Sequence, residues 1–265
     1  MRNSHLMVGA TAAAGILLGA GVAGAADLPA QTYYTKAPAV YAAAYDWSGF
    51  YIGANGGWGQ ERSCDTLTNG ALGVPVAPVR AGCNSGSGAV VGGQYGYRWQ
   101  SNAFVFGVEA QGDWTNLKGA NVSSVNPLVT NQSRINGLGL FTGQVGYAWN
   151  NALLYVKGGA AVTADKYNGL GTATGVGFDQ ASESRFGGTA GAGVEVGFAR
   201  NWSVALEYDH LFMGSNNKTF TSTGLGVGNL VPAGGVERAL NIGQDADMVT
   251  ARINYRWGGP VVSKY

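Results

Sequence analysis

The sequence predicts an all-β protein, an eight-stranded antiparallel up-and-down transmembrane β-barrel with long extracellular loops and short periplasmic turns. Three observations lead to this prediction. Segments in which apolar and polar residues alternate recur eight times, and such alternation gives a strand one apolar face and one polar face. Short and long connections alternate between these segments, which is typical of transmembrane barrels. The chain also begins with a segment that resembles an export signal.

The clearest alternating segment is residues 249–257, near the C-terminus. Its apolar positions are Val249, Ala251, Ile253, Tyr255 and Trp257, and its polar positions are Thr250, Arg252, Asn254 and Arg256. The same alternation predicts strands at residues 47–59, 89–99, 104–114, 137–149, 153–163, 185–198 and 202–211. Segments of roughly 9–11 residues suit a tilted strand that crosses a bilayer.

The connections between these segments fall into two classes. Residues 100–103, 150–152 and 199–201 form short links, whereas residues 60–88, 115–136, 164–184 and 212–247 form long polar ones. Short periplasmic turns and long external loops would produce this order. A soluble β-sandwich has no reason to sort its connections in this way.

The N-terminal region predicts export and a division of the chain into three parts. Residues 1–25 are interpreted as a signal peptide, with an apolar core at 6–22 and a cleavage site of the A-x-A type at Ala23–Ala25; a transmembrane anchor is the alternative. Residues 26–46 lack periodicity and are interpreted as a periplasmic linker. We expect residues 47–265 to form the barrel.

The composition excludes several classes of protein. Charged residues make up 12% of the chain and glycine contributes 45 of its 265 residues, unlike an ordinary soluble domain. The formal net charge of +1 does not indicate a nucleic-acid binder. After the export signal there is no apolar run long enough for a membrane-spanning helix.

Aromatic residues stand near the ends of the predicted strands. Transmembrane barrels carry aromatic girdles at both membrane surfaces, so these side chains are predicted to lie at the membrane interfaces; ordinary core aromatics are the alternative. The predicted interface residues are Trp58, Tyr97, Trp99, Trp114, Tyr147, Trp149, Trp202, Tyr255 and Trp257.

If the apolar face meets lipid, charged residues on the other face point into the lumen. An eight-stranded barrel is just wide enough for side chains to fill it. Buried charges persist when they are paired, so equal numbers of acids and bases predict a salt-bridged lumen; charges lining a water channel are the alternative. The predicted network comprises Arg98, Glu109, Asp113, Lys157, Glu195, Glu207, Arg252 and Arg256.

Cys64 and Cys83 are the two cysteines of the chain. In an exported protein they favour a disulfide over two free thiols. Closing the intervening loop would contribute about 3 kcal/mol on the chain-entropy model.

Several short stretches resemble a known family. They are Ala26-Asp27-Leu28-Pro29, Trp47-Ser48-Gly49-Phe50-Tyr51-Ile52-Gly53, Gly107-Val108-Glu109-Ala110, Gly146-Tyr147-Ala148-Trp149, Leu154-Tyr155-Val156, Gly191-Ala192-Gly193-Val194-Glu195, Asn201-Trp202-Ser203 and Asn254-Tyr255-Arg256. Together they resemble the small porin-family outer-membrane barrels and surface antigens of alphaproteobacteria, within the outer membrane protein A-like superfamily. The resemblance implies an eight-stranded outer-membrane barrel with both termini in the periplasm. Some relatives of this kind bind hemin.

The sequence leaves more than one function open. We expect an integral outer-membrane protein with a structural, envelope-integrity and surface role; a porin for small hydrophilic solutes and a surface-loop binding module (an adhesin or a hemin binder) are the alternatives. We expect no enzymatic activity, since His210, the one histidine after the signal peptide, faces outward while Asp209 beside it points inward. No cofactor or metal site is predicted. The expected partners are outer-membrane lipid and the barrel-insertion machinery, and we expect a monomer.

Overall fold

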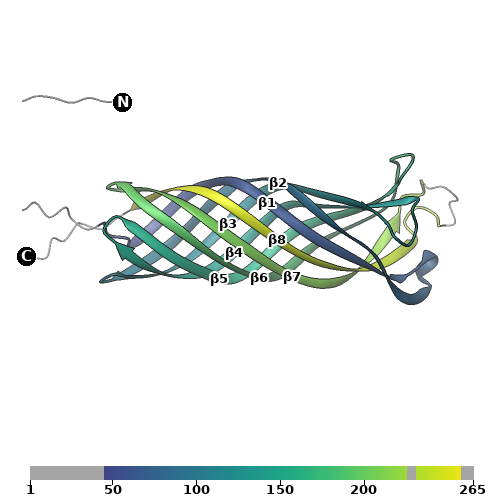
Figure 1. Ribbon diagram of the computed structural model, residues 1–265, viewed down its shortest axis with the longest axis horizontal. Coiled ribbons are helices and arrows are strands. Elements are labelled where there is room, and N and C mark those ends of the chain that lie inside the picture. Colours follow the sequence, from purple (N-terminus) through teal and green to yellow (C-terminus); the bar gives the residue numbers. More distant parts are fainter. Residues whose placement is uncertain (1–44, 226–230, 258–265) are drawn as a thin grey trace, which may run out of the picture. The chain divides into compact units, whose positions relative to one another are not determined.

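A computed structural model describes residues 45–225 and 231–257. Within it, eight antiparallel strands close into a barrel in sequence order (Figure 1). The last strand pairs with the first, with Asn254 opposite Gly53, so the sheet has no open edge. The strands are β1 (Gly49–Asn69), β2 (Pro75–Ser101), β3 (Phe104–Val122), β4 (Val129–Trp149), β5 (Ala152–Gly171), β6 (Gly177–Ala199), β7 (Trp202–Ser222) and β8 (Val236–Trp257), with a short 3-10 turn, η1 (Ala71–Gly73), after β1. The predicted fold class is confirmed.

The strands are much longer than the sequence predicted. They run from 19 residues in β3 to 27 in β2, and the four long connections are mostly strand. At the end of the barrel that carries the long connections, only residues 70–74, 123–128, 172–176 and 223–235 lie between strands. The predicted boundaries were wrong because the ladder continues where the outer face is no longer apolar. Glu61 and Asp65 still point inward and are buried, but polar residues on both faces conceal the period.

The connections at the other end are short, as predicted. Residues 102–103, 150–151 and 200–201 join β2 to β3, β4 to β5 and β6 to β7. Asn102 and Asn150 adopt positive φ angles of 55° and 54°. Asparagine tolerates this conformation, which tight turns often require.

The outward face of the middle of the barrel is apolar, as the alternation predicted. Phe141, Leu154 and Val156 are 61%, 66% and 60% exposed, although such side chains are usually buried. An exposed apolar band that surrounds a barrel is the surface expected to contact lipid.

Two inward glycines make room for tyrosine rings. A Cβ at Gly96 would lie 2.6 Å from the hydroxyl oxygen of Tyr51, and a Cβ at Gly193 would lie 2.5 Å from that of Tyr155. Because each ring crosses the glycine backbone, a larger residue would displace it. The glycine content of this chain is therefore partly a requirement of the packed lumen.

Some predictions lie outside the described residues. These are the signal peptide at 1–25, residues 26–44 of the linker, and residues 258–265 of the predicted barrel. Among residues 45–225 and 231–257, no helix is long and apolar enough to cross a membrane.

The two cysteines form a disulfide, as predicted, but most of the residues between them are strand and only residues 70–74 form a loop. Cys64 on β1 and Cys83 on β2 are directly opposite partners in the ladder, with Cα atoms 4.0 Å apart. The residues between them complete a hairpin of extended strand. The bond therefore joins two neighbouring strands near their outer ends.

Candidate functional site in the barrel lumen

The lumen is built in layers, which can be followed along the inward residues of a single strand. On β5 these run from Leu153 and Tyr155, through Lys157, to Ala161, Asp165 and Tyr167. Apolar and charged positions therefore alternate along the barrel axis. The other strands contribute to the same layers.

An apolar cluster with one ion pair closes the short-turn end. Trp47, Val105, Leu153 and Tyr155 pack together and are at most 2% exposed. Arg98 lies above Trp47, with its guanidinium carbon 5.8 Å from the ring centre. Its Nη2 atom is 2.8 Å from Oε2 of Glu195, on the far side of the barrel.

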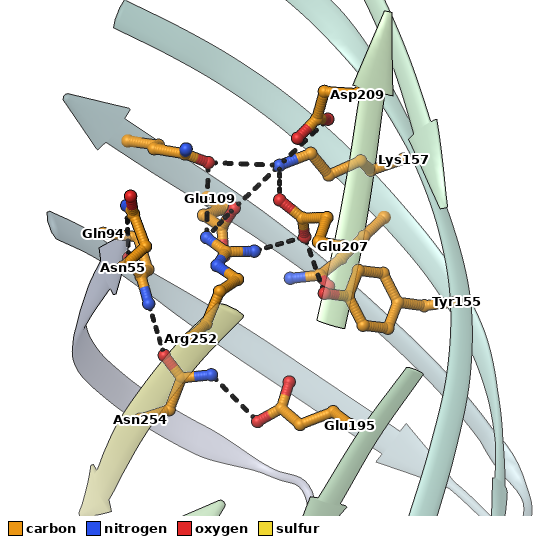
Figure 2. Close-up of polar contacts among 12 residues, drawn as sticks. Asn55, Gln94, Glu109, Tyr155, Lys157, Glu195, Glu207, Asp209, Arg252 and Asn254 are labelled. Carbon is orange, nitrogen blue, oxygen red and sulfur yellow. Dashed lines mark hydrogen bonds and ion pairs between the residues drawn. The ribbon is translucent and has the colours of Figure 1, made fainter. Parts of the chain in front are cut away.

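The next layer, here called the central charge layer, consists of Glu109, Lys157, Glu207, Asp209 and Arg252. Lys157 Nζ lies 3.2 Å from Glu109, 2.7 Å from Glu207 and 3.4 Å from Asp209. Arg252 bridges two of the same acids, with Nη2 2.8 Å from Glu109 and Nη1 against Glu207. Figure 2 shows these side chains converging from β3, β5, β7 and β8. Pairing with two bases offsets part of the cost of burying three acids.

Amide and hydroxyl groups complete the hydrogen bonding around this layer. Asn55 donates to Gln94 at 3.0 Å, Gln94 to Asn254 at 2.7 Å, and Asn254 to Glu195 at 3.0 Å (Figure 2). Tyr155 donates to Glu207 at 2.6 Å. The chain of amides therefore ends on Glu195, the partner of Arg98, while the Tyr155 hydroxyl bonds to the central charge layer.

A third layer, here called the apolar layer, was not predicted from the sequence. It consists of nine buried side chains, and Leu117, Leu140 and Leu211 are each at most 2% exposed. It lies beyond the central charge layer, since Met248 and Ala246 follow Arg252 towards the outer end of β8. The full set is Val90, Leu117, Ile135, Leu140, Ala161, Leu211, Met213, Ala246 and Met248. These side chains occupy the lumen between the central charge layer and the outer end of the barrel.

An outer polar layer follows, above the apolar band that faces lipid. Glu61 accepts hydrogen bonds from Ser133 at 2.6 Å and from Gln244 at 3.3 Å, and Gln244 also reaches Asp165. Burial raises the pKa of Glu61 to about 7, and burial likewise raises the pKa of Asp165 to about 6. Arg185 donates to Glu183 at 2.7 Å.

The eight predicted network residues do not form one cluster. Glu109, Lys157, Glu207 and Arg252 meet in the central charge layer, and Arg98 pairs with Glu195. Asp113 accepts a hydrogen bond from Gln111 at 2.8 Å, and within the described part of the chain it has no basic side chain within 4.0 Å. Arg256 lies at the short-turn end, where it donates to the Ser48 carbonyl at 2.8 Å.

Sequence reasoning missed other members of the network. Asp209, which was predicted to point inward, and Tyr155, which lies on the same face of β5 as Lys157, were not assigned to the network. Asp209 is buried and contacts Lys157, and Tyr51 donates to Glu109 at 2.7 Å. A tyrosine at an inward position beside a glycine on the next strand was the signal that could have identified the two tyrosines.

The predicted interface aromatics lie on the outward face. Trp58 and Trp114, at the outer end of the apolar band, are 59% and 75% exposed. At the short-turn end Tyr97 packs edge-on against Trp99, and Tyr255 against Trp257. The same end carries Tyr147, Trp149 and Trp202, which are 53%, 74% and 41% exposed.

His210 lies in a polar group on the outer wall. Its Nδ1 atom is 2.7 Å from Oδ1 of Asp247, and Tyr208 donates to the same oxygen at 2.6 Å. Asp209, next to it in the sequence, instead faces the lumen. Within the described residues, no group of three or more His, Cys, Asp and Glu side chains is placed to hold a metal ion.

Comparison with known proteins agrees with this architecture. The family model for the outer membrane protein beta-barrel domain matches residues 12–229. A 22 kDa outer membrane protein of Rhizobium leguminosarum is 33% identical over 61% of this chain and 62% of its own length. A 25 kDa outer-membrane immunogenic protein of Brucella abortus is 28% identical over 75% of this chain and 81% of its own length.

Among solved structures, the outer membrane protein OprG from Pseudomonas aeruginosa aligns over 79% of this chain and 97% of its own, with 11% identity and a TM-score of 0.49. The family match covers most of the chain and extends from the N-terminal region beyond the end of β7. The chain therefore belongs to the outer membrane protein β-barrel family and is a protein of the bacterial outer membrane.

Proposed function

We propose that this protein is a structural barrel of the outer membrane that does not conduct solutes. The parts of its strands that continue beyond the apolar band, here called the outer extension, would project from the membrane surface. One observation carries the proposal: the apolar layer follows the central charge layer along the barrel axis, and both consist of buried side chains that occupy the lumen. A solute crossing the barrel would have to displace both. Such a barrel would strengthen and shield the membrane surface.

The dimensions of the barrel support a closed lumen. The interior of an eight-stranded barrel is just filled by its side chains, whereas porins that leave an aqueous channel use 16–18 strands. In this chain the inward space is occupied by long side chains such as Arg98, Lys157 and Arg252, each at most 5% exposed. The porin alternative would require these groups to move aside.

The membrane orientation is part of the proposal. Short turns occur on the periplasmic side of transmembrane barrels, so residues 102–103, 150–151 and 200–201 would face the periplasm, as would both chain termini. Residues 1–25 would direct export, 26–46 would form a periplasmic linker, and 47–265 would form the barrel. Insertion would use the general barrel-assembly machinery, and the protein would act as a monomer without catalytic activity.

Proteoliposome swelling tests the closed lumen. The purified protein, shown to be folded by a heat-dependent shift in gel migration, is reconstituted and diluted into an iso-osmotic solution of a small sugar. We expect swelling at the rate of protein-free liposomes. Rapid swelling that scales with protein content would overturn the proposal and favour a porin.

A second candidate function is binding through the outer tips. Leu72, Leu128 and Leu225 are 66%, 70% and 61% exposed in three of the four outer connections. Exposed apolar side chains at loop tips often mark interaction sites. Binding of the protein to host-cell surfaces or to hemin, compared with a variant in which these leucines are changed to serine, tests this role. Equal binding by the two proteins would exclude it.

A further inference from the structure

Three basic side chains stand next to one another on the outer wall. Lys118 on β3 is the ladder partner of Arg134 on β4, and Arg134 is the partner of Lys166 on β5. All three occupy outward positions, and the two lysines are exposed. Adjacent strands are about 4.8 Å apart, so this cation row spans roughly 10 Å.

The position of the cation row is set by the apolar band beneath it. On β5 the outward residues Val162 and Ala164 are followed directly by Lys166. On β3 the last outward aromatic is Trp114, which is 75% exposed. The next two outward residues on this strand are Asn116 and Lys118. The row therefore lies where the lipid-facing surface ends on the proposed external side.

The charges of the row are not neutralised by the protein. Within the described residues, no acidic side chain lies within 4.0 Å of the basic groups of Lys118, Arg134 or Lys166. Asp245 and Asp247 on the outer wall belong to β8, four strands from Arg134 around the ring. Like charges directly opposite each other on neighbouring strands destabilise a sheet. An anion bound to the row would remove that repulsion.

A groove opens in the lipid-facing wall just below the row. It has a volume of about 420 Å³ and crosses β3, β4, β5 and β6. Trp114, Val162 and Ala164 contribute apolar walls, and Gly112 and Gly137 provide the depth. The rest of the lining is Ser184 and three residues on the lumen side of their strands, Asp113, Leu138 and Thr163. Its place in the membrane and its apolar lining suit a hydrocarbon chain.

We propose that the cation row and this groove together bind a phosphorylated lipid of the outer leaflet, with its phosphate groups on Lys118, Arg134 and Lys166 and an acyl chain in the groove. Arginine binds phosphate through two parallel hydrogen bonds, and lysine contributes a strong point charge. The juxtaposition of three unpaired cations with an apolar groove favours an amphipathic anion over a free one. The inference rests on the proposed orientation of the barrel but not on the closure of its lumen.

Native mass spectrometry in detergent micelles tests the proposal, with diphosphorylated lipid A as the probe. Dephosphorylated lipid A with the same acyl chains isolates the role of the phosphates, and inorganic phosphate tests for a free-anion site. The charge variant is K118Q/K166Q. The matched control, R62Q/R80Q, removes two exposed charges from β1 and β2 on another part of the outer surface.

We expect the phosphorylated lipid to bind the wild-type protein more tightly than its dephosphorylated form. K118Q/K166Q should weaken this binding roughly 30-fold, since each cation near a membrane surface contributes about one kilocalorie per mole. R62Q/R80Q should change it by less than about twofold. A164W, which fills the groove, should weaken lipid binding, while R134K should retain it.

Three results would overturn the proposal. They are equal binding of the two lipids, equal losses in the two double variants, and displacement of the lipid by inorganic phosphate at similar concentration, which would indicate a free-phosphate site. Each variant is first checked for heat-dependent gel migration, and K118M/K166M replaces the charge variant if it does not fold. Because binding is measured without reference to solute flux, a conducting lumen would leave this test unaffected.

Discussion

Arg98 of β2 and Glu195 of β6 are joined by an ion pair of 2.8 Å that crosses the barrel from one wall to the other. The two strands lie four apart in the ring of eight, and the two side chains are 2% and 1% exposed. Arg98 also lies over the ring of Tyr51, with its guanidinium carbon 4.4 Å from the ring centre. Opposite walls of the membrane-spanning region are therefore tied together directly rather than only through neighbouring strands.

Breaking this pair from one side should destabilise the barrel strongly. E195Q leaves the Arg98 charge buried without its partner, and removal of one member of a buried pair costs about 3–5 kcal/mol. The free energy of unfolding in lipid vesicles, measured by urea titration with tryptophan fluorescence, should fall by an amount of that order. The double variant R98M/E195L should be more stable than E195Q. A double variant that is less stable than E195Q would contradict a role for the buried charge.

Lys157 should be the most sensitive position of the central charge layer. K157M removes the cation that contacts Glu109, Glu207 and Asp209, so that these three acids face Arg252 alone. The expected loss is again about 3–5 kcal/mol, and adding E207Q should recover part of it by removing one acid. Urea unfolding of the two variants measures both effects. Additive losses would show that Lys157 and Glu207 are not coupled.

The disulfide should stabilise the outer extension and leave the membrane-spanning part unchanged. C64S/C83S removes the cross-link between β1 and β2, and we expect faster hydrogen exchange in residues 60–85 but unchanged exchange around Arg252. The change in opening free energy should not exceed about 3 kcal/mol. Faster exchange throughout the barrel would show that the bond acts globally.

The outer end should become less stable as the pH rises. The pKa of Glu61 is raised from 4.5 to about 7, and that of Asp165 from 3.8 to about 6, both by burial first. The folded protein therefore binds more protons than the unfolded chain between about pH 4 and pH 7. The stabilisation from these two carboxyl groups is complete below their pKa values in the unfolded chain. It is lost as the pH rises through their pKa values in the folded protein.

We expect the wild-type protein to be more stable at pH 5 than at pH 8, by on the order of 2 kcal/mol. E61Q/D165N should remove the part of this difference that Glu61 and Asp165 contribute and leave that of Asp65, whose pKa burial raises to about 6. Urea titrations of both proteins at the two pH values provide the comparison. An equal pH dependence in the variant would assign the effect to other groups.

The fold and part of the lumen could be predicted from the sequence. Alternation identified the strands wherever one face is apolar, and it placed Arg252, Lys157 and Glu109 inward, where they meet. It did not show which inward residues share a layer, because this depends on the stagger between strands. Asp209 lies beside Lys157 only through the register of β5, β6 and β7.

Two features escaped prediction for physical reasons. The strand extensions beyond the apolar outward band have polar residues on both faces, so no period marks them. The apolar layer draws single side chains from several strands, and an isolated inward Leu117 or Leu140 resembles an irregularity in the pattern. Both features depend on how neighbouring strands pair, which the pattern of residues along a single strand does not show.

Single-channel recording in a planar bilayer tests the central claim most directly. The folded protein is inserted from the same preparation that shows heat-dependent migration, and the current is recorded in concentrated potassium chloride with L117A/L140A/L211A as a comparison. With the lumen closed by the apolar layer and the central charge layer, we expect the wild-type protein to give no stable conductance steps. Large, long-lived steps from the wild-type protein would contradict the closed lumen.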